Sequence, residues 1–224
     1  MDVLGKLDKW VKAHGNGNYH PDNVQDLPKY VTEESYGIQQ NKKEISKLTK
    51  VLQNHFKNKK KLKVLEVGLG HYGSTHFLWT LLFEKVCTIE KNIDRVSEFA
   101  LNYHNFYNRK KSIKNRKSYF MYGYSFNPKI VAQVYDLYND GIDFLFIDGD
   151  HKYESVLADW IMYSNLVKKN GIVAFHDCNL KDSMYGQNGV YKLLKDLKKI
   201  DPKTSKKLNK ISFTDILGIA YYIK

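Results

Sequence analysis

The spacing of apolar residues changes at about residue 61. Upstream, apolar residues recur at helical spacing on one face, at Ile45, Leu48, Val51, Leu52 and Phe56. Downstream, short apolar runs alternate with amphipathic stretches of helical period. This change predicts two parts, an N-terminal helical extension over residues 1–60 and a larger α/β domain over residues 61–224.

Five strand-then-helix units follow one another in the larger part. The predicted strands are short and lie at 64–67, 86–90, 118–123, 142–148 and 171–177. IDFLFID (142–148) is almost wholly apolar, which is typical of a strand buried on both faces of a parallel sheet. KISF and LGIAYYIK then close the chain as two neighbouring strands. We expect an α/β fold with a doubly wound, mostly parallel, seven-stranded Rossmann-like sheet and a C-terminal antiparallel β-hairpin.

Composition limits the partners of such a domain. The formal net charge is +12 over 224 residues, but the excess is spread over helices, which favours a solvated lysine-rich surface over a nucleic-acid site. The densest cluster, NRKKSIKNRK (108–117), contains no aromatic residue for base stacking. No apolar run approaches the roughly 20 residues of a membrane span, and no signal peptide is visible. We expect a soluble, cytoplasmic protein with Cys87 and Cys178 as free thiols.

A glycine turn in KVLEVGLGHYGST (63–75) is the strongest chemical signal. Gly68 and Gly70 lie where the first strand ends and a helix begins, so the backbone can bend tightly and approach a ligand. Gly73 completes a spacing that is also found in dinucleotide-binding proteins. Glu66, however, would repel a pyrophosphate and attract an ammonium or sulfonium group. The turn therefore favours S-adenosylmethionine (SAM) as cofactor over NAD.

Polar residues also follow the other strands, at the edge where ligands bind in doubly wound sheets. Glu90 ends the second strand and can accept hydrogen bonds from ribose hydroxyls. Asp148 and His151 follow the fourth strand, and His176 and Asp177 follow the fifth. Two carboxylates and an imidazole can hold a divalent cation, and either histidine can instead act as a general base. The residues leave these two alternatives open.

Several motifs together resemble the class I SAM-dependent methyltransferases: LEVGLGHYGST, TIEKN, FLFIDGDHKYESVLADW, GIVAFHD and LGIAYYIK. The branch with IDGDH and a strand-five HD is similar to small-molecule O-methyltransferases. The resemblance covers residues 61–224 and implies that Glu66, Gly68 and Gly70 hold the methionine part of SAM. It further implies that Glu90 binds the ribose and that Asp148 borders the methyl group.

The resemblance also carries two departures. Metal-dependent relatives bind Mg²⁺ through acidic residues after strands four and five; Asp148 and Asp177 fit this pattern, while His176 stands where many relatives have a second aspartate. After strand three, Tyr124 occupies the place of an aspartate that contacts the adenine amine, which leaves Ser125, or stacking on the Tyr124 ring, as the substitute.

The sequence therefore predicts a SAM-dependent methyltransferase. It would transfer methyl to an oxygen of a small hydroxylated acceptor, such as a sugar or another metabolite, with Asp148, His176 and Asp177 as metal ligands. Residues 1–40 would form a lid over the acceptor. The alternatives are an RNA or other nucleic-acid methyltransferase recruited by the basic surface, and an NAD-binding or inactive Rossmann-like protein. The acceptor and the oligomeric state remain open.

Overall fold

The computed structural model describes residues 2–14, 19, 40–70, 72–107, 117–181, 188–214 and 217–224. Its elements are α1 (Val3–His14), α2 (Lys42–His55), β1 (Lys63–Val67), α3 (Ser74–Leu82), β2 (Lys85–Glu90), α4 (Ile93–Tyr107), β3 (Lys117–Tyr122), α5 (Pro128–Leu137), β4 (Ile142–Ile147), α6 (Tyr153–Tyr163), η3 (Ser164–Leu166), β5 (Val167–Phe175), α7 (Gly189–Ile200), α8 (Pro202–Ser205), β6 (Asn209–Ile211) and β7 (Ile219–Ile223). The alternation of strand and helix after residue 61 is as predicted.

The strands form one seven-stranded sheet in the order β3-β2-β1-β4-β5-β7-β6. Strands β1 to β5 pair in parallel, whereas β7 is antiparallel to β5 and to β6. In the register, Val67 pairs with both Ile89 and Ile147, and Ile147 pairs with Phe175. The carboxyl ends of β1, β2, β4 and β5 are therefore level. The predicted fold is confirmed, and its strand-end residues share one edge.

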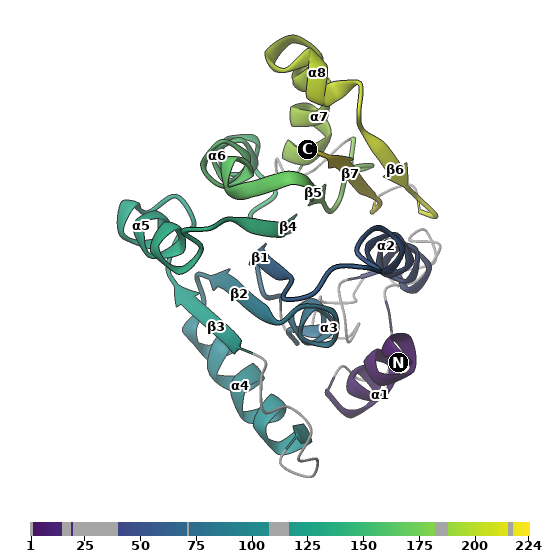
Figure 1. The fold of residues 1–224 in the computed structure, drawn as a ribbon, viewed down its shortest axis with the longest axis vertical. Helices are drawn as coiled ribbons and strands as arrows, with labels where there is room; N and C mark the ends of the chain where they lie inside the picture. Colours follow the sequence, from purple (N-terminus) through teal and green to yellow (C-terminus); the bar gives the residue numbers. More distant parts are fainter. Residues whose placement is uncertain are drawn as a thin grey trace, which may run out of the picture.

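Helices cover both faces of the sheet (Figure 1). Successive strand residues point to opposite faces, so each strand contributes to two cores. One core joins Val64, Phe144 and Phe146 to helices α1 to α4, and the other joins Leu65 and Leu145 to helices α5, α6 and α7. Burial on both faces explains the nearly continuous apolar runs in the sequence.

Side-chain caps begin helices α2 and α5, among others. Asn41 Oδ1 accepts hydrogen bonds from the Lys43 amide at 2.9 Å and the Glu44 amide at 3.2 Å, which starts α2. Asn127 caps α5 with Pro128 in its first turn, as the Asn-Pro pair indicates. Both cysteines are buried and free. Among the described residues, no helix has the length and apolar character that crossing a bilayer requires.

Helix α1 lies within the first core rather than apart from the sheet. Val3, Leu7, Trp10 and Val11 are buried, and the Trp10 ring stacks on Phe77 of α3 with centroids 4.5 Å apart. Residues 15–18 and 20–39, which make up most of the predicted lid, lie outside the described residues. The first helix of the predicted extension thus shares its packing with the larger part of the chain.

Candidate active site

The glycine turn after β1 closes onto the end of β4. Gly68 has a φ of +92° and Gly70 a φ of +67°, which are left-handed values that favour glycine. A Cβ atom on Gly68 would lie 2.1 Å from the carbonyl oxygen of Asp148. The Asp148 amide in turn donates to the Val67 carbonyl at 2.9 Å. The predicted turn and the predicted acidic residue are therefore in direct contact.

Glu90 ties this turn to the end of β2. Its Oε2 accepts a hydrogen bond from the Leu69 amide and its Oε1 accepts one from the Asn92 amide, both at 2.9 Å. The side chain is buried. A carboxylate has about four lone-pair positions, so Glu90 retains the capacity to accept hydrogen bonds from a ligand at the same edge.

Glu66 lies beneath the turn rather than at its surface. The side chain is fully buried, and its oxygens accept hydrogen bonds from Trp79 Nε1 at 2.8 Å and Thr88 Oγ1 at 2.6 Å. Burial raises the pKa of Glu66 to about 8, although these donors oppose the shift. The structure thus engages both oxygens with protein donors, whereas the sequence assigned them to the methionine part of a cofactor.

His76 extends this buried network, and the sequence analysis missed it. Its Nδ1 lies 2.7 Å from Thr88 Oγ1 and its Nε2 lies 2.7 Å from Ser118 Oγ. The Thr88 hydroxyl has one proton, which it donates to Glu66. It must therefore accept the hydrogen bond from His76, which requires that Nδ1 of His76 carries a proton. Burial lowers the pKa of His76 to about 3, which keeps the ring neutral. The cue in the sequence that could have found this residue is a histidine among the apolar residues of α3.

The buried Glu66 carboxyl makes stability depend on pH. Its pKa in the folded chain, about 8, lies above the ordinary value of 4.5. The stabilising contribution is therefore complete below pH 4.5 and is lost as the pH rises through about 8. Since one pKa unit corresponds to about 1.4 kcal/mol, Glu66 contributes a slope of up to that size per pH unit.

We expect Glu66→Gln, which has no titrating proton, to remove this slope. As the pH rises from about 5 to about 8, the free energy of unfolding of the wild type should fall relative to that of the variant. Guanidinium denaturation across this range measures the difference. Glu98→Gln, at an exposed position on α4, is the matched control. Equal pH slopes in wild type and Glu66→Gln would contradict the prediction.

Four titratable side chains meet at the ends of β4 and β5. His176 Nδ1 lies 3.2 Å from Asp148 Oδ1 and 3.1 Å from Asp177 Oδ1. His151 Nε2 lies 3.1 Å from Asp177 Oδ2 and 3.8 Å from Asp148 Oδ1. The His176 side chain is 2% exposed and that of His151 is 29% exposed. All four residues predicted from the strand ends thus come together, with His151 the more accessible imidazole.

Their charges are mutually dependent. Burial raises the pKa of Asp148 and Asp177, but the neighbouring imidazoles outweigh it and hold both carboxyls below their usual range. Burial lowers the pKa of the histidines, but the two carboxylates outweigh it, raising His151 to about 9 and His176 well above its ordinary value. The ion pairs therefore favour the charged form of each of the four side chains.

Gln40, which no motif in the sequence marks, joins the cluster from the region before α2. Its Nε2 donates to Asp148 Oδ2 at 2.6 Å, across 108 positions of sequence. The side chain is buried, and among the described residues its Oε1 has no hydrogen-bond partner. His176 Nε2 is likewise buried without a partner there. Buried polar atoms of this kind are usually hydrogen-bonded to protein, water or a bound group.

A divalent cation has one compatible set of ligands among the described residues. Asp148, His151 and Asp177 each offer an atom, and these atoms lie within 4.8 Å of one another. His176 was the predicted third ligand, and this stays a prediction; its Nδ1 lies 3.2 Å from Asp148 Oδ1 and 3.1 Å from Asp177 Oδ1. Two carboxylates and one imidazole suit a borderline cation such as Mn²⁺ or Zn²⁺ as well as Mg²⁺.

The loop after β3 supplies the last predicted residue, Ser125. The Gly123 amide donates to the Glu90 carbonyl at 3.0 Å, which places this loop beside the end of β2. Tyr124 is exposed, and its ring stacks on Phe126 with centroids 5.4 Å apart. Ser125 lies deeper, and its carbonyl accepts a hydrogen bond from Tyr163 Oη of α6. Gly123 thus anchors this loop to β2, and Ser125 anchors it to α6.

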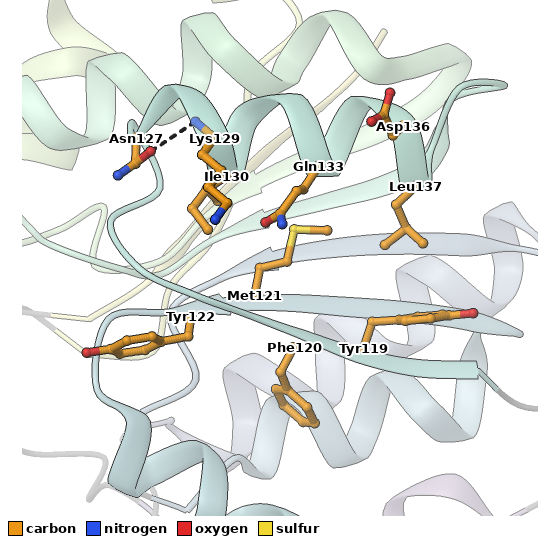
Figure 2. A pocket seen from close by; sticks show the side chains of 10 residues that line it. All are labelled: Tyr119, Phe120, Met121, Tyr122, Asn127, Lys129, Ile130, Gln133, Asp136 and Leu137. Carbon is orange, nitrogen blue, oxygen red and sulfur yellow. Dashed lines mark hydrogen bonds between the residues drawn. The ribbon is translucent and has the colours of Figure 1, made fainter.

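A separate cavity lies between the edge strand β3 and α5 (Figure 2). It has a volume of about 730 Å³ and is lined by Tyr119, Phe120, Met121, Tyr122, Asn127, Lys129, Ile130, Gln133, Asp136 and Leu137. Met121 points from the strand toward Ile130 and Gln133 of the helix (Figure 2). None of the predicted site residues lines it, so we do not assign it to the candidate active site.

Comparisons with known proteins agree with this architecture. Residues 84–178 match a family model described as a methyltransferase domain. A segment of 54 residues is 43% identical to an uncharacterized protein of Acanthamoeba polyphaga mimivirus, and it spans 24% of this chain and 24% of that protein.

Solved structures of methyltransferases share the fold over most of the chain. A candidate caffeoyl-CoA O-methyltransferase from Staphylococcus aureus is 17% identical with a TM-score of 0.56, covering 99% of this chain and 91% of that one. An rRNA methylase from Streptococcus thermophilus is 11% identical with a TM-score of 0.57, covering 84% and 98%. MycE of the mycinamycin pathway, solved with Mg and SAH (S-adenosylhomocysteine), is 14% identical with a TM-score of 0.52, covering 96% and 53%.

These findings identify the fold of the protein. The sheet order and the antiparallel C-terminal pair give a Rossmann-like methyltransferase fold, and the matched segment contains β2 to β5 with the Glu90 and Asp148 strand ends. The chain thus has a fold shared with solved methyltransferases, and its match to the methyltransferase-domain model covers residues 84–178.

Proposed function

We propose that this protein transfers a methyl group from SAM to an oxygen of a small hydroxylated acceptor, such as a sugar or another metabolite. One observation carries the proposal: the glycine turn and Glu90 lie at the same sheet edge as the cluster of Asp148, His151, His176 and Asp177. A cofactor held by the glycine turn and Glu90 would present its sulfonium methyl to an acceptor bound at this cluster.

The chemistry needs little beyond positioning and removal of one proton. The bond from the methyl carbon to sulfur breaks as a bond to the acceptor oxygen forms, and the hydroxyl proton passes to a base. His151 is the accessible candidate, and because its pKa is raised to about 9, the ring becomes free to accept a proton only as the pH approaches that value. The ionised Asp148 would orient the acceptor hydroxyl beside it.

A divalent cation is the alternative to a histidine base. Asp148, His151 and Asp177 would hold it, and the bound cation would lower the pKa of the acceptor hydroxyl. MycE, a protein of similar fold, was solved with Mg and SAH, which supports testing the present chain for a divalent cation. Dialysis against a chelator distinguishes the two: full activity afterward rejects the cation and favours histidine.

The cofactor assignment has a direct test in Glu90. We expect calorimetry to show binding of SAM and SAH but not of NAD. Glu90→Ala should weaken SAH binding by at least about tenfold, because a hydrogen bond to a charged acceptor contributes roughly 1.5–3 kcal/mol. Glu90→Gln keeps the shape of the side chain and should lose less. Unchanged SAH affinity in Glu90→Ala would remove Glu90 from the cofactor site.

The acceptor class is tested with the intact chain. Release of SAH from SAM should follow addition of sugars or other small alcohols. The basic charge and the fold shared with an rRNA methylase make RNA the second candidate. Methylation of RNA but of no small alcohol, with a steep fall in RNA binding as salt rises, would replace the proposal with that alternative.

A further inference from the structure

Strand β3 ends the sheet on one side. It pairs with β2, and no strand within the described part of the chain pairs with its other edge. An open edge presents unpaired N–H and C=O groups, so proteins usually keep such a strand short or place charges on it. The opposite edge strand, β6, follows this rule, with three residues that include Lys210. Strand β3 has six residues, and after Lys117 it continues as SYFMY without a charge. It therefore lacks the usual protection against pairing.

The cavity between β3 and α5 runs along this unprotected strand. Four successive residues of β3, from Tyr119 to Tyr122, line one side of it, and α5 lines the other. Figure 2 shows Lys129 of α5 toward the Tyr122 end of the strand and Asp136 toward the Tyr119 end. The helix thus runs antiparallel to β3. Met121 is half-buried, and Tyr122 is 57% exposed. The cavity combines apolar and aromatic strand side chains with a polar helix face.

The exposed face of α5 carries opposite charges at its two ends. Lys129, Ala132, Gln133 and Asp136 are exposed, and their spacing of three and four residues places them on one face. Lys129 and Asp136 lie two turns apart, and neither forms an ion pair with another described residue. The midpoint between them falls at Ala132 and Gln133. Figure 2 shows Met121 of β3 pointing toward Gln133. The charge of the helix face therefore changes sign near the middle of the cavity.

Such a surface is complementary to a second copy of itself. In a symmetric dimer one patch contacts its own copy, so a residue at one end of the patch meets the residue at the other end. A two-fold axis that passes perpendicular to the sheet near Met121 would set the two β3 strands antiparallel. The same axis would set the two α5 helices antiparallel on one face of the joined sheet. Lys129 of each copy would then approach Asp136 of the other, which favours a second copy over an unrelated peptide strand.

We propose that β3 and α5 form the interface of a symmetric dimer of this chain, in which the two sheets join edge to edge. Main-chain hydrogen bonds between the β3 strands and contacts of the apolar side chains hold the copies together. The two pairs of Lys129 with Asp136 fix the antiparallel arrangement, because charged groups at an interface contribute specificity more than affinity. This interface does not depend on the proposed methyl transfer, and its test requires neither cofactor nor acceptor.

Sedimentation of the full chain over a series of concentrations tests the interface through its charges. The wild type should sediment as two chains at micromolar concentration. Lys129→Asp makes both ends of the α5 face acidic and Asp136→Lys makes both basic, so each variant brings like charges together twice. Each should weaken the dimer by at least about tenfold. Both positions are exposed, so folding should be preserved. Lys192→Asp, at an exposed position of α7, makes the same charge change outside the interface and should leave the dimer intact.

Mixing the two single variants is the decisive step. An acidic α5 face then meets a basic one, both contacts again join opposite charges, and a mixed dimer should form with nearly the affinity of the wild type. The double variant Lys129→Asp with Asp136→Lys should dimerise by itself for the same reason. A fault in folding would not be repaired by mixing. A monomeric wild type, single variants as dimeric as the wild type, or a mixture that stays monomeric would each overturn the inference.

Discussion

Replacing Asp148 with asparagine is expected to lower the rate of methyl transfer by at least about 100-fold. Asp148 is the point at which the site converges: its Oδ1 lies 3.2 Å from His176 Nδ1, and its Oδ2 accepts a hydrogen bond from Gln40 at 2.6 Å. Asparagine removes the charge and leaves both imidazoles facing a single carboxylate. Either proposed route, a histidine base or a bound cation, needs that charge. The measurement is SAH release with an acceptor found by the screen above.

The control for this variant is Asp150→Asn, two residues away. The Asp150 carboxylate is exposed and bonds to Ser155 Oγ at 3.0 Å, outside the cluster. It should retain nearly the full rate. Because loss of one partner of a buried ion pair also destabilises a protein, the melting temperature and SAH affinity of both variants are measured alongside. Transfer at the wild-type rate by a folded Asp148→Asn protein would exclude Asp148 from the chemistry.

Much of the site could be predicted because parallel strands end at one edge of a sheet. The apolar runs located β1, β2, β4 and β5, and the residues after each run were Gly68, Glu90, Asp148 and His176. The level register of these strands brings such residues together, whatever their separation in sequence. Strand position alone was therefore enough to predict that the acidic and histidine residues converge.

The partners of each side chain were not predictable in the same way. Glu66 lies in a strand whose residues alternate between faces, and the face it occupies holds Trp79 and Thr88, which engage its oxygens. Gln40 contacts Asp148 from a region where no motif marks it. Local patterns indicate where a strand ends, but such contacts depend on helix placement, which arises from packing across the whole chain.

The same limit applies to the N-terminal region, which hydrophobic spacing assigned to a separate extension. The buried face of α1 lies in the core that also contains Val64 and Phe146 of the sheet. Deletion of residues 1–40 would therefore remove core packing and the Gln40 contact together with any lid. A loss of activity after such a deletion would not by itself indicate a lid. Substitution of a single core residue is the better test of whether α1 belongs to the core.

Trp10→Ala is expected to destabilise the whole chain by about 3–5 kcal/mol. The Trp10 ring is fully buried, and its centroid lies 4.5 Å from that of Phe77 and 5.4 Å from that of Phe99. Alanine therefore leaves a cavity between α1, α3 and α4. Guanidinium denaturation should show one transition, shifted to lower denaturant. Lys12→Ala, at an exposed position of α1, should change stability by no more than about 0.5 kcal/mol. An unshifted main transition in Trp10→Ala would instead make α1 a separable extension, because a helix outside the core can lose its largest side chain without weakening the sheet.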